Sequence, residues 1–275
     1  ALETGDDIMA EQFLNQSLER KYYNPDQINM YLARIYGQRQ KIDKVISYIE
    51  KISTGPLFVD SRIFAAQAIR AENGIDQAIE YLDQYKSLDR QEKLKFLQLK
   101  SSFLYNDNQF LKAIDLMLSE EEKYSDSAEF YFDFGLLHEK NKDFDAMESK
   151  LKKAISLKPD YAIAYNALGY SYADRNVKLD DAKRYIEIAL SIEPQNHYIL
   201  DSMGWVHYRL GNYDIAYEFI TKAYSIQEDP EIAAHLGEVL WKQGKENEAI
   251  SIWQGSLERF PENSILIETK NRLFQ

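Results

Sequence analysis

The chain has 275 residues, 45% of them hydrophobic and 28% charged, so it can bury a sizeable core and is too apolar to stay disordered. Its net charge of −12 argues against nucleic acid as a partner, because nucleic-acid binding depends on Lys and Arg that neutralise phosphates. The absence of cysteine excludes disulfides and thiolate zinc sites, and no run of about 18 apolar residues suggests a membrane span.

Helices should dominate the fold, because the chain has only 11 glycines and 6 prolines. A leading helix is predicted from Asp6 to about Lys21. Three units with a weak repeat follow at residues 26–58, 59–93 and 94–127. The residues that share their register are Leu32, Ala33, Tyr36, Val45 and Ile49 in the first, Ala65, Ala66, Ile69, Ala78 and Leu82 in the second, and Leu97, Ser101, Leu104, Ala113 and Met117 in the third.

From residue 128 the repeat is much clearer, and four successive units carry the same residue types at the same spacing. The first has Tyr131, Phe134, Gly135, His138, Met147, Leu151, Ala154 and Pro159, and the second has Tyr165, Leu168, Gly169, Tyr172, Ala182, Ile186, Ala189 and Pro194. The third has Leu200, Met203, Gly204, His207, Ala216, Ile220 and Ala223, and the fourth has Ala233, Leu236, Gly237, Leu240, Ala249, Trp253, Ser256 and Pro261.

The spacing has a physical reason in a pair of packed helices. The glycine of each unit is predicted to lie where the two helices approach most closely, with large residues three and four positions away filling the space beside it. Gly211 and Gly244 are predicted to end the first helices in a left-handed conformation. Pro159, Pro194 and Pro261 are predicted to stop the second helices, because proline cannot continue the hydrogen-bond ladder.

These motifs resemble the tetratricopeptide repeat (TPR) superfamily. The resemblance implies an all-α fold, a right-handed superhelix or α-solenoid of about seven helical hairpins with capping helices at both ends. We expect a single solenoid over residues 1–275, with a helix in 1–25, seven repeats in 26–263 and a capping helix in 264–275. The closing segment offers four apolar residues for capping, namely Leu266, Ile267, Leu273 and Phe274.

A narrower resemblance rests on residues 201–211 and 229–241, followed by Trp253. They are similar to the C-terminal part of TPR proteins of Gram-negative bacteria, among them outer-membrane lipoproteins that act as adaptors of a carboxyl-terminal processing protease. The resemblance implies a periplasmic protein held at the outer membrane, with a lipid anchor upstream of residue 1, and a cytoplasmic location is the alternative. The implied partners are the protease and cell-wall hydrolases. Members of that group are usually longer and begin at a lipidated cysteine, which this chain lacks.

No pattern in the sequence favours catalysis, a metal or a cofactor, and we predict none of them. His138 and His207 occupy the large-residue position of the repeat, so we expect them in the core. His235 and Glu238 lie three residues apart on one helix, and we interpret them as a polar helix face and not as half a metal site. Phosphate-binding loops and nucleophile motifs are absent.

Binding residues are predicted from the superfamily resemblance, in which the first helix of each hairpin lines the concave side of the superhelix. Its second, fifth, ninth, twelfth and thirteenth positions point into the groove, where the hairpin does not need them for packing. The partner-binding residues predicted in this way in the last three repeats are Asn166, Tyr170, Tyr198, Asp201, Trp205, Tyr208, Arg209, Glu238 and Trp241. Trp, Tyr and Arg are the residue types that most often dominate binding energy at interfaces. Packing of Trp205 or Trp241 against a neighbouring repeat is the alternative.

The basic clamp of chaperone-binding TPR domains is not present at these positions, so a chaperone partner is not expected. The leading hypothesis is a non-enzymatic scaffold or adaptor, which brings a periplasmic processing protease together with its protein substrates. Two alternatives remain open: a TPR subunit of a secretion or envelope-assembly complex, and a regulatory TPR fragment of a larger enzyme.

Overall fold

A computed structural model describes residues 7–20 and 24–273. This part of the chain contains 16 α-helices, one short 3-10 helix and no strand, as the all-α prediction requires. None of the helices in it is both long and apolar enough to span a membrane. The chain forms two compact units, which meet in sequence between Glu120 and Glu121. The single solenoid predicted from the repeats therefore stays a prediction.

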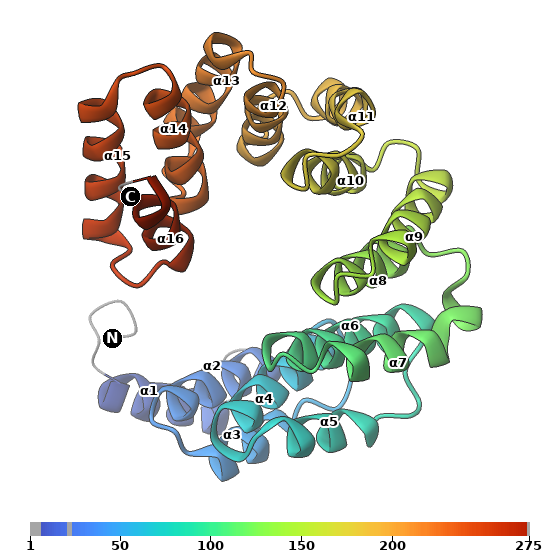
Figure 1. Cartoon of the computed structure of the whole chain (residues 1–275). Helices are drawn as coiled ribbons and strands as arrows, with labels where there is room; N and C mark the ends of the chain where they lie inside the picture. The colour runs from blue at the N-terminus through green and yellow to red at the C-terminus, as the bar shows by residue number, and fades with distance from the viewer. Residues whose placement is uncertain (1–6, 21–23, 274–275) are drawn as a thin grey trace. The chain divides into compact units, whose positions relative to one another are not determined.

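The first unit contains one helix and three helical hairpins (Figure 1). Its helices are α1 (Asp7–Arg20), α2 (Pro25–Gln38), α3 (Ile42–Ile49), α4 (Phe58–Asn73), α5 (Ile75–Asp83), α6 (Arg90–Asn106) and α7 (Phe110–Glu120). The three weak repeats predicted from the sequence are thus real hairpins, α2/α3, α4/α5 and α6/α7. Helix α2 begins at Pro25, one residue before the predicted unit, because Asn24 caps it by accepting a bond from the Asp26 amide.

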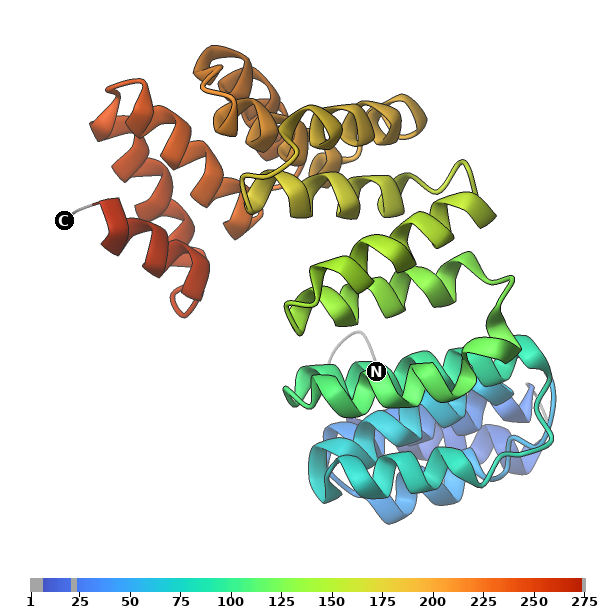
Figure 2. The same cartoon turned by 45° about the vertical axis from the view of Figure 1, so that its right-hand side comes forward.

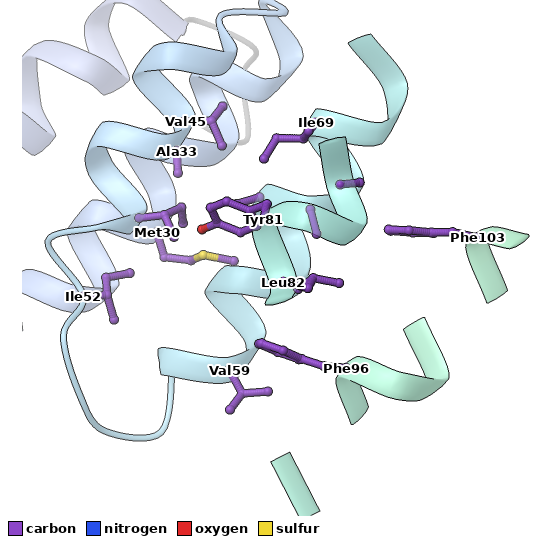
Figure 3. Close-up of a cluster of buried hydrophobic side chains, with 14 of the residues drawn as sticks. Met30, Ala33, Val45, Ile52, Val59, Ile69, Tyr81, Leu82, Phe96 and Phe103 are labelled. Atoms are coloured by element: carbon purple, nitrogen blue, oxygen red, sulfur yellow. The ribbon is translucent and has the colours of Figure 1, made fainter. Parts of the chain in front are cut away.

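The core of the first unit lies between successive hairpins (Figure 3). Met30 and Val45 of the first hairpin, Ile69 and Leu82 of the second and Phe96 of the third belong to one buried cluster. Side chains three or four positions apart therefore pack against both neighbours in the stack, as the repeat pattern predicts.

A buried arginine packs beside this cluster. The guanidinium of Arg62 lies 4.1 Å from the ring centroid of Phe58 and donates a 3.0 Å bond to the carbonyl oxygen of Ile49. This carbonyl lies at the end of α3 and also accepts a 2.9 Å bond from the Ile52 amide, so Arg62 adds a second bond to the helix end.

The second unit contains four hairpins and a closing helix (Figure 2). A 3-10 turn, η1 (Glu121–Tyr124), is followed by α8 (Ala128–Lys140), α9 (Phe144–Leu157), α10 (Ala162–Asp174), α11 (Leu179–Ile192), α12 (His197–Arg209), α13 (Tyr213–Ile226), α14 (Pro230–Lys242), α15 (Glu246–Arg259) and α16 (Ser264–Leu273). Within this unit α10, α12 and α14 lie on the inner side of the curve and α11, α13 and α15 on the outer side (Figure 1).

Glycine is required at the closest approach of the paired helices, as predicted. A Cβ on Gly204 would lie 2.3 Å from Ile220 Cγ1 and 3.0 Å from the Ala216 carbonyl oxygen on the facing helix. A Cβ on Gly237 would lie 2.0 Å from Trp253 Nε1. Any larger residue at these positions would push the two helices apart.

The helix ends also follow the sequence signals. Gly211 and Gly244 have φ values of 80° and 77° at the turns of the last two hairpins. The second helices α9, α11 and α15 each end two residues before a proline, as predicted for Pro159, Pro194 and Pro261.

The two capping segments differ in how well they match their predicted role. In α16, Leu266 is fully buried, whereas Ile267 is exposed and does not cap, and Thr269 is buried instead. Helix α1 buries Ala10 but exposes Phe13, so it covers less apolar surface than expected. The remaining predicted capping and boundary residues (Asp6, Lys21, Phe274 and the side chain of Leu273) lie outside what the structure describes.

Candidate partner-binding face

The predicted binding residues lie on α10, α12 and α14, which pack side by side in the second unit. We call the surface formed by these three helices on the inner side of the curve the inner face (Figure 1). Its helices begin at well-formed caps: Asn196 accepts the amide of Tyr198 at the start of α12, and Asp229 accepts the amide of Glu231 at the start of α14. Caps of this kind fix where each helix starts and so set the register of the side chains along it.

A buried ion pair joins two neighbouring repeats across this face. His235 Nδ1 of α14 lies 2.8 Å from Asp201 Oδ2 of α12, and the side chains of both residues are 7% exposed. Burial lowers the pKa of His235, but the charge of Asp201 and its hydrogen bond outweigh burial, so the pKa lies above 6.5. When it is protonated, the imidazole compensates a carboxylate that would be costly to bury alone.

An aromatic stack lies directly beside the ion pair. The indole of Trp205 is stacked between the His235 ring at 3.9 Å and the Tyr208 ring at 4.7 Å, measured between centroids. The guanidinium carbon of Arg209 lies 4.7 Å from the centroid of the same indole. Arg209 also donates a 2.8 Å bond to the carbonyl oxygen of Asp174 on α10. The stack thus connects three successive repeats.

Two more polar bonds cross the inner face. Tyr170 of α10 donates a 2.6 Å hydrogen bond to Glu231 of α14, and burial with the nearby charge of Glu231 raises its pKa. Tyr208 donates a 3.1 Å bond to Glu238, and burial with the charge of Glu238 raises its pKa as well. Both tyrosines are therefore neutral donors at physiological pH.

The structure brings six of the nine predicted residues together: Tyr170, Asp201, Trp205, Tyr208, Arg209 and Glu238. These positions were expected to be free because one hairpin does not need them for its own packing, but Asp201, Trp205 and Glu238 are 4–5% exposed and contact a neighbouring hairpin. The reason is the direct contact of neighbouring first helices, which the packing within one hairpin does not reveal. Trp205 packs against a neighbouring repeat, as the alternative interpretation held.

The other three predicted residues lie apart from this network. Tyr198 is 54% exposed, and its ring centroid lies 4.1 Å from that of His197 with the two rings tilted by 43°. Asn166 is half-buried on α10. Trp241 is half-buried, and its ring centroid lies 5.9 Å from that of Trp253 in the same hairpin.

The interpretation of His235 and Glu238 as a polar helix face is a further error, since both are buried. The network also includes Glu231, which holds a groove position but was not among the nine predicted residues, and Arg272, which sequence reasoning missed. A signal was present: Asp201 and His235, like Glu238 and Arg272, are 34 residues apart, one repeat period. Residues one period apart lie at the same level of adjacent repeats and can touch.

Two other histidines, on α8 and α12, lie in the core of their hairpins. His138 and His207 are buried, as expected from their repeat position, and burial lowers the pKa of each. Within residues 7–20 and 24–273, no group of three or more His, Asp or Glu side chains is placed to hold a metal ion.

Comparison with known proteins identifies the repeats. The tetratricopeptide repeat family matches residues 128–161 and 198–230. A TPR repeat-containing protein of Pseudomonas aeruginosa, PA4667, is 30% identical over 213 residues, which are 78% of this chain and 36% of that protein. The chain thus spans about a third of the length of this curated relative.

Solved structures share the fold at low sequence identity. A thermophilic TPR protein of Thermus thermophilus, TTC0263, has a TM-score of 0.60 at 19% identity and covers 66% of this chain and 99% of its own. A tetratricopeptide repeat protein of Parabacteroides merdae has a TM-score of 0.66 at 12% identity and covers 91% of this chain and 99% of its own. These likenesses establish the helical-hairpin fold of TPR solenoids.

Proposed function

Because the chain is built from tetratricopeptide repeats, whose proteins are generally non-catalytic interaction scaffolds, we propose that it binds a protein partner through the inner face of α10, α12 and α14. The observation that carries the proposal is a set of buried contacts around Trp205, beside which other side chains reach solvent. The buried stack of Trp205 fixes Arg209, while Tyr198 is left largely exposed one helical turn before Asp201. Preorganised aromatic and arginine side chains lose little entropy on binding.

The finer proposal concerns the partner. The resemblance of residues 201–211 and 229–241 to TPR lipoproteins supports an adaptor that brings a carboxyl-terminal processing protease to its substrates, such as cell-wall hydrolases. This proposal places the protein in the periplasm at the outer membrane. A scaffold can accelerate such a reaction without catalytic residues, since binding both proteins at once raises their effective concentration.

The test is partner capture with variants that leave the core intact. Trp205→Ala is unsuitable, because removing a buried indole would destabilise the fold. We therefore choose Tyr198→Ala with Arg209→Ala, whose side chains reach solvent. The matched control removes an exposed apolar and an exposed basic side chain from the outer helix α13, as Ile215→Ala with Lys222→Ala.

Each protein is incubated with envelope extract of the source organism, and bound proteins are identified by mass spectrometry. We expect the wild type and the α13 control to retain a processing protease or a cell-wall hydrolase, and the α12 variant to lose it. Equal capture by both variants would reject the inner face as the binding surface. Capture of secretion or envelope-assembly components instead would favour that alternative and reject the protease-adaptor role.

The regulatory-fragment alternative has a different test. The complete reading frame around this chain would show a catalytic domain if the repeats regulate an enzyme in the same polypeptide. A lipoprotein signal at its start would support the adaptor.

A further inference from the structure

Glu238 is a buried carboxylate whose cationic partner comes from the closing helix. Its side chain is 4% exposed, and it forms an ion pair with Arg272 of α16, whose side chain is 59% exposed. Tyr208 donates to the second oxygen of the same carboxylate. Arg272 therefore approaches from the solvent side, and its guanidinium covers a carboxylate that belongs to the inner face.

A carboxylate in this position needs a cation, because an uncompensated buried charge is strongly destabilising. The cation that Arg272 supplies is easily exchanged, however. The Arg272 side chain is 59% exposed, so it can leave Glu238 without unpacking a core, and the main packing partners of α16 are α14 and α15. A guanidinium brought by another molecule could take the same place without disturbing the repeats.

The surroundings of Glu238 have further unused capacity for hydrogen bonds. Asp201 Oδ1 and Trp205 Nε1 are buried and make no hydrogen bond to any described residue. His235, which pairs with Asp201, and Tyr208, which donates to Glu238, both stack on the Trp205 indole, so the two carboxylates lie near the same aromatic stack. An incoming guanidinium would therefore meet the negative potential of these carboxylates.

We propose that Glu238, with Tyr208 and Asp201 beside it, is an arginine-binding subsite of the inner face, which Arg272 occupies when no partner is bound. This rests on the proposed function and names the partner's chemistry: a protein segment that presents an arginine to α12 and α14. The net charge of −12 favours such a basic segment. Displacement of Arg272 releases α16 from Glu238 as the partner binds.

The experiment uses N-acetyl-arginine amide as the probe and N-acetyl-citrulline amide as its neutral analogue of the same shape. Binding is measured by tryptophan fluorescence in the wild type, in Arg272→Ala and in Arg272→Ala with Glu238→Gln. We expect Arg272→Ala to bind the arginine probe about fivefold more tightly than the wild type, because the competing side chain is gone. The citrulline probe should not bind, and the double variant should not bind either probe.

Three outcomes would overturn the proposal: equal affinity of Arg272→Ala for both probes, unchanged binding in the double variant, or loss of the folded state in Arg272→Ala. The last, read by circular dichroism, would show that α16 cannot leave Glu238. Failure here is distinguishable from failure of the proposed function, since partner capture that depends on Tyr198 and Arg209 would persist without an arginine subsite.

Discussion

In the second unit the first helix of every hairpin has 13 residues and the second has 14. In the first unit the corresponding lengths are 14 and 8, 16 and 9, and 17 and 11. The period is also less regular there, because successive first helices from α2 to α8 start 33, 32 and 38 residues apart, whereas those from α8 to α14 start 34, 35 and 33 residues apart. A close glycine contact fixes the crossing point in the second unit, whereas the first unit has Ala33, Ala66 and Ser101 in the matching register.

The inner positions of the two units differ even more. At the ninth position of the first helices, the first unit has Arg34, Gln67 and Ser102, all of them exposed. The second unit has Trp205 and Glu238 at the same position, both buried in contacts between repeats. The same repeat geometry therefore supports either a solvated face or a packed polar network, and the side chains decide which one forms.

The largest effect should come from Trp205→Ala. Removal of a buried indole leaves a cavity, so we expect the free energy of unfolding to fall by about 3–5 kcal/mol. Gln67→Ala, at the same repeat position in the first unit, should change it by less than about 0.5 kcal/mol. Urea unfolding curves of the two variants provide the measurement, and comparable losses would contradict the contrast between the two units.

The ion pair between His235 and Asp201 in the second unit predicts that the free energy of unfolding depends on pH. The pKa of His235 is raised above 6.5, so its stabilising contribution is complete below pH 6.5 and is lost as the pH rises through the folded-state value. His235→Gln should therefore cost about 3 kcal/mol at pH 5.5 and less above pH 7.5.

Chemical denaturation of wild type and variant across this range measures that difference. The lowered pKa values of His138 and His207 act in the opposite direction, but both residues are present in both proteins and their effects cancel. A cost of His235→Gln that does not change with pH would show that the imidazole is not charged in the folded chain.

The glycine contact gives the next smaller effect. Gly204→Ala puts a Cβ against Ile220 and the Ala216 carbonyl, and the strain should cost about 1–3 kcal/mol. Gly37→Ala in the first unit meets only the end of the Phe64 ring, at 3.0 Å, and should cost less. Thermal melting of both variants decides the order, and the reverse order would reject close glycine packing as the cause of the regular hairpins.

The smallest effect is a gain in stability. Gly255 lies inside α15 and a Cβ there would meet no atom within 4 Å, so Gly255→Ala should stabilise the chain by about 0.5–1 kcal/mol. The melting temperature should rise accordingly. A decrease would mean that α15 packs more closely than the structure shows.

The hairpins were predictable from the sequence because Gly135, Gly169, Gly204 and Gly237 recur with the period and each satisfies a contact inside one hairpin. The site was predictable only in part. Trp205 and Asp201 were selected by position, but their burial depends on His235 from the next repeat. Arg272 lies outside the repeats, in the closing helix, and the only sequence signal for it is its distance of one repeat period, 34 residues, from Glu238.

The central claim is that a protein partner binds the inner face of the second unit, and hydrogen–deuterium exchange of the chain with and without a captured partner tests it most directly. We predict slower exchange on binding in residues 162–174, 197–209 and 230–242, with little change in 179–192 and 213–226. Protection confined to the outer helices, or to residues 25–120, would contradict it.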